Sequence, residues 1–379
     1  MEERLNPALY LHVPFCLKRC NYCNFLSYPY DSRMAQSYLR SLQEELRLYR
    51  EKFGVQSLRT IYFGGGTPSC LGDSILEIIK SIRSLFPLED GAELTLEVNP
   101  GSIDLACLKS FRKAGINRLS IGAQTFTHDL LRFLGRIHGP QETIQTFLQA
   151  KEAGFTNISL DLIYAIPGQV LSDLARDLEQ VYRLTPEHLS LYNLKIEPDT
   201  PLARQMERGK FSHFGEDREA EMFAYAIEDL EKHGYCHYEI SSFCRQGREG
   251  KHNLVYWNFE PYWGLGPGSS GYTGKYLYQN INDLAGYESS LLNGSLPISE
   301  KNPLTRAEQI SYYIILGLRK LAGIDLVSFQ KRFGQDFASI FSREEEELKV
   351  RGLLQREGKT LRLSKRGIFL ANDVWEKFI

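Results

Sequence analysis

The sequence predicts an α/β fold in which parallel βα units form the larger part and a small α+β domain follows. Strand-like apolar runs alternate with amphipathic, helix-like stretches through residues 1–200. Beyond residue 303 the pattern changes to helices followed by a short hairpin. Six strands joined by helices form parallel βα units with right-handed crossovers. Both a partial (βα)6 barrel and an open doubly wound sheet fit this pattern.

The six expected strands are short and mostly apolar, as is typical of strands buried on both faces. They are Ala8–Phe15, Thr60–Gly64, Glu93–Asn99, Arg118–Gln124, Asn157–Ala165 and His188–Ile196. The helices between them are indicated by apolar residues at helical spacing. We place these helices at Met34–Phe53, Ser74–Leu85, Asp104–Ala114, Glu142–Ala153 and Leu171–Tyr182.

Residues 201–295 differ in character and form an expected extension of the barrel domain, residues 1–200. A charged helix, Glu216–Lys232, precedes an aromatic and glycine-rich stretch from Tyr256 to Tyr278. The closely spaced glycines of that stretch predict irregular backbone. Asn293–Asn302 is rich in turn-forming residues and predicts a linker.

The C-terminal residues 303–379 predict a winged-helix-like domain. Helices are expected at Thr305–Lys320, Leu326–Arg332 and Phe337–Arg351, with two strands around Glu357–Lys359 and a last helix from Ser364. Winged helices often bind DNA, but the third helix carries four consecutive glutamates whose charge would repel phosphate. We therefore expect a packing or lid role for this domain and no nucleic-acid partner.

Charge and hydropathy narrow the class of protein further. The net charge of −2 and the pI of about 6.5 give no overall positive field for nucleic acid or a membrane surface. No apolar run reaches the ~18 residues of a membrane helix, so membrane association is expected to be at most indirect. Residues Met1–Pro7 lack the basic start and apolar stretch of a signal peptide. We expect a cytoplasmic protein.

Three of the seven cysteines, Cys16, Cys20 and Cys23, follow the first strand with C-x3-C-x2-C spacing. Three thiolates on one loop can hold three irons of a cubane cluster. The fourth iron then stays open to an exogenous ligand, as in metal sites that perform chemistry. Lys18 and Arg19 lie between these cysteines, and we expect their charge to lower the pKa values of the thiols.

A structural zinc site is the alternative interpretation of this loop. Zinc takes four ligands, usually as one closely spaced cysteine pair followed by a second pair. His12 is the nearby candidate for a fourth ligand, although a histidine on a buried strand is more often a core residue. Spacing alone favours the cluster only slightly. The other four cysteines are scattered and indicate ordinary thiols.

Further polar residues stand at the ends of the expected strands. They are the turn G-G-G-T-P at residues 64–68, Glu97, Gln124, Arg136 and Asp161. In a parallel βα barrel the carboxyl ends of the strands meet on one face, where active sites lie. We therefore expect these groups to converge on the cysteine loop.

The cysteine spacing, with an aromatic residue directly before the third cysteine, resembles the radical S-adenosylmethionine (SAM) superfamily. The resemblance implies a [4Fe–4S] cluster on Cys16, Cys20 and Cys23, with SAM bound to the open iron. It implies that an electron from the cluster cleaves SAM to a 5′-deoxyadenosyl radical. It also implies a full or partial barrel, and so favours a partial (βα)6 radical SAM barrel over the open sheet.

Together these segments resemble the oxygen-independent coproporphyrinogen III oxidase family over nearly the whole chain. The resemblance implies SAM contacts from Tyr10, Gly65, Gly66, Thr67 and Glu97. A second SAM-binding set of that family matches Tyr22, Gln124, Arg136 and Asp161. Two departures put oxidase activity in doubt: the first strand begins near residue 8 without a long extension before it, and Phe25 stands where the oxidases carry a fourth cysteine.

The motif H-N-L-V-Y-W at residues 252–257 resembles the H-N-x-x-Y-W hallmark of the HemW-like haem chaperone branch of the family. Imidazole is a standard axial ligand of haem iron, and aromatic residues offer flat apolar area for a macrocycle. His252 is therefore expected to bind haem, against the competing interpretation of a core histidine. HemW-like sequences commonly carry G-A-H soon after this motif, whereas this chain has Gly268, Ser269 and Ser270.

The resemblance predicts a haem chaperone that binds haem and a SAM-ligated [4Fe–4S] cluster and passes haem to an acceptor protein, with an electron donor as a further partner. The alternative is an oxygen-independent oxidase that decarboxylates coproporphyrinogen III to protoporphyrinogen IX. Its substrate's propionates would pair with Arg19, Arg136 or Lys195. Radical modification of RNA would need a basic face, which the net charge does not supply.

Overall fold

The computed structural model describes residues 6–212 and 214–379. The expectation about a signal peptide rests in part on Met1–Leu5, which lie outside the described residues. Twelve strands form one mixed sheet in the order β14-β13-β12-β11-β1-β4-β5-β6-β7-β8-β10-β9. Its centre consists of six parallel strands, β1 (Ala8–Val13), β4 (Leu58–Gly65), β5 (Leu88–Val98), β6 (Arg118–Gln124), β7 (Ile158–Tyr164) and β8 (His188–Asn193). All six predicted strands are confirmed.

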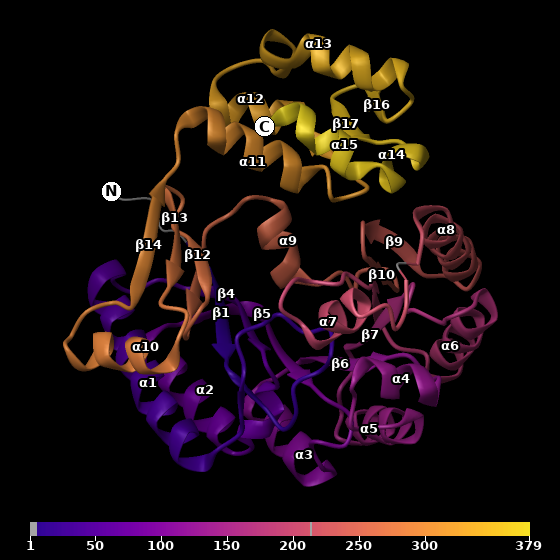
Figure 1. The fold of residues 1–379 in the computed structure, drawn as a ribbon. Helices are drawn as coiled ribbons and strands as arrows, with labels where there is room; N and C mark the ends of the chain where they lie inside the picture. The colour runs from indigo at the N-terminus through magenta and orange to yellow at the C-terminus, as the bar shows by residue number, and fades with distance from the viewer. Residues whose placement is uncertain (1–5, 213) are drawn as a thin grey trace.

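Helices cover the outer face of these strands (Figure 1). They are α1 (Ser32–Phe53), α2 (Ser74–Leu85), α3 (Leu105–Ala114), α4 (His128–Leu134), α5 (Pro140–Glu152) and α6 (Leu171–Leu184). Leu9 and Leu11 of β1 point into the core beneath these helices, whereas Tyr10 and His12 alternate to the inner face. The inner face is polar, and the outer face carries the hydrophobic core.

Helix α4 was not predicted. It has seven residues, which is too short for the helical spacing of apolar residues to repeat. The same holds for α7 (Pro201–Glu207) and α9 (Lys251–Trp257). These three short helices connect longer elements and depend on tertiary packing rather than on their own sequence pattern.

The extension contributes strands at both edges of the parallel sheet. After α8 (Glu216–Lys232), β9 (Cys236–Glu239) and β10 (Ser242–Cys244) pair antiparallel beyond β8. At the other edge β11 (Tyr262–Leu265) pairs parallel with β1 and is followed by β12 (Ser270–Tyr272), β13 (Tyr276–Asn280), α10 (Leu284–Leu292) and β14 (Ile298–Pro303). The predicted linker Asn293–Asn302 is therefore wrong in its second half, where the polar, mostly exposed residues of β14 form the edge strand.

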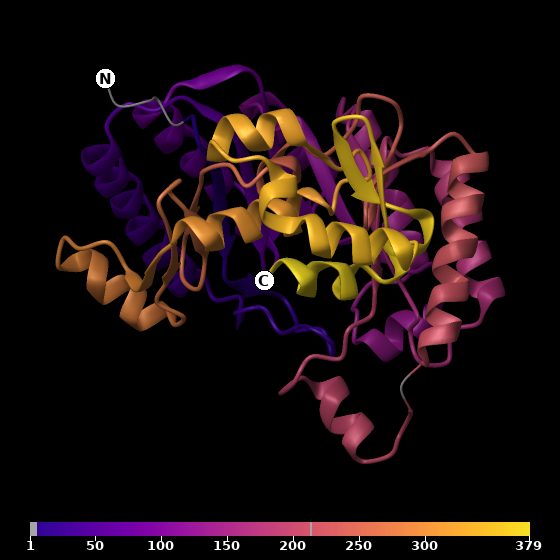
Figure 2. The same cartoon turned by 90° about the horizontal axis from the view of Figure 1, so that it is seen from above.

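The C-terminal domain has its own hydrophobic core and the predicted winged-helix-like composition. It contains α11 (Arg306–Gly317), β15 (Ile324–Asp325), α12 (Leu326–Phe333), α13 (Phe337–Val350), β16 (Leu354–Glu357), β17 (Thr360–Leu363), α14 (Lys365–Phe369) and α15 (Ala371–Trp375). Seen from above, this domain lies over the barrel (Figure 2). Backbone hydrogen bonds from Ile240 to Arg319 and from Leu321 to Tyr238 fasten it there. In the described residues no helix is long and apolar enough to cross a membrane.

Candidate functional site

The cysteine loop begins at the carboxyl end of β1, in the short strand β2 (Phe15–Cys16). Cys16 is buried, Cys20 and Cys23 are half-buried, and all three are free thiols. Cys20 and Cys16 each contribute to raising the pKa of Cys23, so the three sulfurs interact electrostatically. In the described part of the chain no three histidine, cysteine or carboxylate side chains already stand close enough to hold a metal ion. A cluster would have to draw the sulfurs together.

The glycine turn after β4 fits closely around this loop. A Cβ added to Gly66 would lie 2.5 Å from the carbonyl oxygen of Phe15 and 3.0 Å from Cys16 Sγ. Thr67 is buried beside it and donates its hydroxyl to Cys16 Sγ at 3.5 Å. The turn therefore brings backbone and one hydroxyl donor directly to a cysteine sulfur, which suits a thiolate that holds iron.

Arg136 connects the loop to the strand ends. Its guanidinium donates to Cys20 Sγ at 3.3 Å, to Asn99 Oδ1 at 2.7 Å and to the Gly122 carbonyl at 3.0 Å. Tyr22 also interacts with this guanidinium, which contributes to raising the pKa of Arg136. The Arg136 Nε is buried without a hydrogen-bond partner. A small cavity of about 20 Å³, lined by Cys20, Thr67, Asn99 and Arg136 among others, opens at this point.

Gln124 ends β6 in a backbone conformation that is unusual for its residue type. Its φ is 64°, in the left-handed region that side chains other than glycine rarely adopt. The parallel pairing with β7 shifts register between Ile121 and Gln124. Such strain persists where the surrounding structure enforces it, and it is found frequently at binding sites.

Deeper in the barrel, Tyr10, Tyr62 and Glu97 converge from β1, β4 and β5. A Cβ on Gly64 would lie within 3.2 Å of all three side chains. Tyr62 donates its hydroxyl to Glu97 Oε1 at 2.9 Å. Burial raises the pKa of Glu97 to about 8, and the nearby Asp161 adds to this effect. Burial likewise raises the pKa of Tyr10.

Asp161 lies on the inner face of β7, farther from the loop. Its oxygens accept hydrogen bonds from Ser120 at 2.8 Å and from Ser159 at 3.1 Å. Burial raises its pKa, while the buried Arg118 lowers it in part. The site residues thus form two groups, one around the cysteine loop and one in the barrel interior, which Gly64–Thr67 connects.

The expectation that His12 is a core histidine is confirmed. It is buried, and its ring nitrogens face the Leu26 carbonyl at 3.0 Å and the Tyr10 hydroxyl at 3.3 Å, so it is no free fourth zinc ligand. The expectation that Lys18 and Arg19 lower the pKa values of the thiols is wrong in its net direction. Burial raises the pKa values of Cys16 and Cys23, and the charge of Arg19 lowers the pKa of Cys23 only in part. Arg19 also donates to the Cys23 carbonyl.

His252 lies at the opposite end of the barrel, on α9. Its Nδ1 lies 2.7 Å from Thr60 Oγ1 and its Nε2 lies 2.7 Å from Tyr256 Oη. Glu93 accepts its backbone N–H at 3.0 Å, and the side chain is buried. Burial and the nearby Arg118 lower the pKa of His252 to about 3. Both ring nitrogens are therefore engaged in this conformation.

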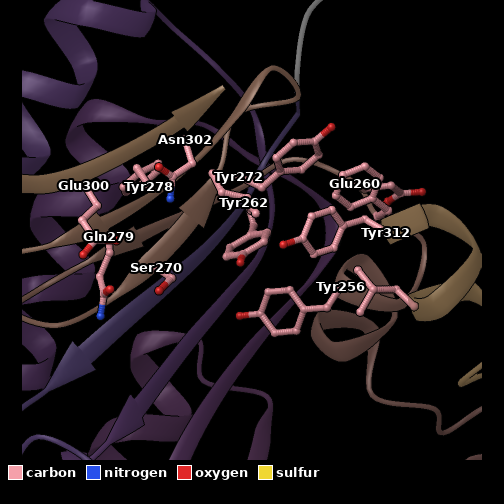
Figure 3. Close-up of a pocket in the computed structure, with 13 residues that line it drawn as sticks. Tyr256, Glu260, Tyr262, Ser270, Tyr272, Tyr278, Gln279, Glu300, Asn302 and Tyr312 are labelled. Atoms are coloured by element: carbon pink, nitrogen blue, oxygen red, sulfur yellow. The ribbon is translucent and has the colours of Figure 1, made fainter. Parts of the chain in front are cut away.

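An aromatic line joins the two ends of the barrel. The ring centroids of Tyr10 and Tyr62 are 6.1 Å apart, those of Tyr62 and His252 are 5.0 Å apart, and those of His252 and Tyr256 are 5.0 Å apart. Tyr256 in turn lines a cavity of about 360 Å³ between the extension and the C-terminal domain (Figure 3). The sequence motif at residues 252–257 thus stands between the barrel interior and this cavity.

Sequence reasoning missed Tyr62, Asn99 and Arg118. Strand alternation could have found Tyr62, because it shares the inner face of β4 with Thr60. Asn99 stands two residues after Glu97, where the strand ends. Arg118 gives no such signal, since an arginine at the start of a strand is more often exposed than buried.

Two family patterns match the chain. That of the Radical SAM superfamily matches residues 10–181, and that of the HemN C-terminal domain matches residues 304–370. The sequence is 36% identical to "Heme chaperone HemW" of Bacillus subtilis over 98% of this chain and 99% of that protein. It is 36% identical to the protein of the same name from Lactococcus lactis over 100% of this chain and 98% of that one.

A solved structure resembles the chain over most of its length. It is described as coproporphyrinogen III oxidase (HemN) from Escherichia coli, a radical SAM enzyme. The TM-score is 0.86 at 25% sequence identity, covering 98% of this chain and 90% of that one.

Proposed function

This chain belongs to the radical SAM superfamily and, within it, to the family of the haem chaperones HemW, and from that premise we propose that it carries haem to an acceptor protein. The barrel binds a [4Fe–4S] cluster and SAM, and the haem is cargo rather than substrate. The observation that carries this proposal is the match to haem chaperones over the full length of both chains. Delivery would take place in the cytoplasm, with an electron donor as second partner.

The residues of the loop suit the cluster. Cys16, Cys20 and Cys23 would hold three irons, and Thr67 and Arg136 would stabilise the bound sulfurs through the hydrogen bonds they already donate. When bound, the cluster supplies an electron and an open iron position for SAM. Arg136 offers a positive charge that offsets the negative charge of the thiolates.

The remaining site residues divide between two roles. One group comprises the turn Gly65, Gly66 and Thr67 beside the loop, together with Tyr10 and Glu97 behind it in the barrel interior, and we assign SAM to this group. A second group comprises Tyr22, Gln124, Arg136 and Asp161. Of these, Tyr22 and Arg136 interact directly, Gln124 holds a strained backbone, and Asp161 accepts hydrogen bonds from Ser120 and Ser159.

The solved structure that resembles this chain is an oxidase, so oxidase activity is the second candidate. Phe25 counts against it, because its ring is exposed on the loop where the oxidases carry a fourth cysteine. An anaerobic assay of the reconstituted protein with SAM, a reductant and coproporphyrinogen III, followed by porphyrin chromatography, separates the two functions. We expect no protoporphyrin from protein whose cluster binds SAM. Many turnovers would make this chain an oxidase.

A further inference from the structure

The carboxyl end of β6 closes in a tight, strained turn. The Thr125 backbone N–H donates to the Ala123 carbonyl oxygen at 2.8 Å, across Gln124, whose φ is 64°. A hydrogen bond that spans one residue with positive φ marks the rare and strained form of the γ-turn. Such strain persists only where other contacts enforce it. Another part of the structure must therefore hold this turn.

The carboxylate of Asp177 on α6 supplies that hold. Its Oδ2 accepts the Thr125 hydroxyl at 2.7 Å, and its Oδ1 accepts the Phe126 backbone N–H at 2.6 Å. The Thr125 hydroxyl oxygen in turn accepts the backbone N–H of Thr127, which directly precedes α4, at 3.1 Å. One side chain of α6 thus fixes the three residues that follow Gln124.

Asp177 is a costly way to hold a loop. Its side chain is 1% exposed, and burial raises its pKa to about 7. The charge of Asp173 raises this pKa further, whereas the hydrogen bonds from Thr125 and Phe126 lower it. Burying a carboxylate costs free energy that the hydrogen bonds only partly offset. The geometry of the turn is therefore maintained against two unfavourable contributions, backbone strain and the burial of a charge.

The turn directs the Gln124 side chain toward the cysteine loop. A Cβ added to Gly122 would lie 2.9 Å from Gln124 Nε2 and 3.3 Å from Arg136 Nη2. Asn99 Oδ1 would lie 3.3 Å from the same point, and Arg136 also donates to Cys20 Sγ. The Gln124 side chain is 8% exposed, and within the described part of the chain no hydrogen bond engages its amide. A polar side chain that is nearly buried and unpaired beside a binding site is suited to a ligand.

We propose that Asp177 is a positioning residue, which holds the Gln124 amide in place to bind a polar group of SAM. This inference rests on the proposed function and adds a residue of α6 to those that determine SAM affinity. Both oxygens of the Asp177 carboxylate are engaged by the turn. Asp177 therefore acts through the turn rather than on the ligand.

The experiment measures the dissociation constant of SAM for the full-length, cluster-loaded chain by anaerobic equilibrium dialysis. Asp177→Asn keeps the size of the side chain but replaces one acceptor oxygen by an NH₂ group, so that either Thr125 or Phe126 loses its acceptor. This variant should bind SAM about tenfold more weakly than wild type. Thr125→Val removes the donor hydroxyl and should also weaken binding, whereas Thr125→Ser keeps the hydroxyl and should bind as wild type does. The iron content per chain checks that each variant is folded.

A double variant separates positioning from general stability. Gln124→Ala should weaken SAM binding, and the addition of Asp177→Asn should weaken it no further, because the two residues act as one unit. Glu45 provides the matched control, since it is a second buried carboxylate whose pKa burial raises to about 7. It binds Gly266 and Asn280 of the extension instead of the turn. Glu45→Gln should lower the urea midpoint and leave the SAM affinity unchanged.

The outcomes distinguish this inference from the function on which it rests. Equal SAM affinities of wild type and Asp177→Asn would overturn the role of Asp177 and leave the proposed function intact. The same conclusion would follow if the effects of Gln124→Ala and Asp177→Asn were additive, or if Glu45→Gln weakened SAM binding as much as Asp177→Asn. Should Asp177→Asn not fold, the comparison of Thr125→Val with Thr125→Ser decides. A wild type that does not bind SAM would refute the proposed function itself.

Discussion

At the scale of single residues, the glycine turn after β4 requires a residue without a side chain at position 66. Gly66 has no room for a Cβ, because the Phe15 carbonyl oxygen would lie 2.5 Å away. We expect Gly66→Ala to displace the cysteine loop, to lower the reconstituted iron content, and to cost about 1–3 kcal/mol of stability through overpacking. Iron analysis and urea unfolding measure the two effects.

Gly250→Ala is the matched control for this change. Its nearest neighbour would be Tyr238 Oη at 3.4 Å, an ordinary contact, and its φ of −69° is one that alanine adopts. This variant should keep the iron of wild type. If both variants lost iron equally, the fit of the turn around the loop would not be the cause.

The raised pKa of Glu97 has a consequence for stability. The carboxyl titrates near 4.5 when unfolded and at about 8 in the folded chain. Between these values the unfolded state releases the proton first, so the stability of the cluster-free protein falls as the pH rises. We expect Glu97→Gln to flatten that fall, as measured by urea midpoints from pH 5 to 8.5. An unchanged slope would show that Glu97 is ionised in the folded state.

The sequence predicted which residues gather at the site better than it predicted what each one touches. The spacing of Cys16, Cys20 and Cys23 predicts metal ligands because such ligands lie close together in the sequence, and the family resemblance favours iron over zinc. The contact of Arg136 with Cys20 joins residues 116 positions apart, and no local pattern encodes it. Likewise, the H-N-L-V-Y-W motif does not reveal that its histidine faces inward and its tyrosine faces the cavity.

At the scale of elements, Glu45 of α1 holds the added strands against the barrel. Its buried carboxylate accepts hydrogen bonds from the Gly266 backbone at 2.9 Å, Asn280 at 2.7 Å and Tyr287 at 2.6 Å. Removing the acceptor leaves buried donors without it, so Glu45→Ala should cost about 3 kcal/mol or more. Tyr287→Phe removes one donor and should cost about 1 kcal/mol.

Urea unfolding compares the stability of these two variants, provided that the free energy of unfolding depends on urea concentration with the same slope in both. A Glu45→Ala protein as stable as Tyr287→Phe would show that the carboxylate does not fasten β11, β13 and α10 to α1. The prediction is independent of haem and iron, since none of these residues lies at the cysteine loop.

Sequence patterns predicted the helices and strands whose own apolar residues form the core. They missed those that form only by pairing or packing with neighbouring elements. The six central strands are apolar enough to read directly, and α2 and α8 have the predicted bounds. By contrast, β14 is polar and becomes a strand only because β13 supplies hydrogen bonds at the sheet edge. No local sequence pattern predicts the pairing of β14 with β13, so these polar residues were interpreted as a linker.

At the scale of the molecule, Arg319 couples the C-terminal domain to the barrel. Its guanidinium lies 4.2 Å from the ring centroid of Trp257 and 3.9 Å from the buried carboxylate of Glu239. Arg319→Ala leaves that carboxylate without its cation and should let the domain, which has its own core, unfold separately. Calorimetry should then show two transitions instead of one.

Arg351→Ala provides the comparison. Its ion pairs with Glu347 and Asp373 are partly exposed and lie within the C-terminal domain, so the change should cost about 1 kcal/mol or less. Two transitions in wild type as well would show that the domains are not coupled. The domain also supplies Tyr312 and Leu316 to the wall of the cavity beside α9.

The central claim is that this chain binds haem while carrying its iron–sulfur cluster. The most direct measurement is an anaerobic titration of the cluster-loaded, full-length protein with haem, with iron, sulfide and haem counted per chain. Saturable binding of one haem per chain, with the cluster retained, is the predicted result. Binding that does not saturate, or haem uptake that occurs only as the cluster is lost, would contradict the account.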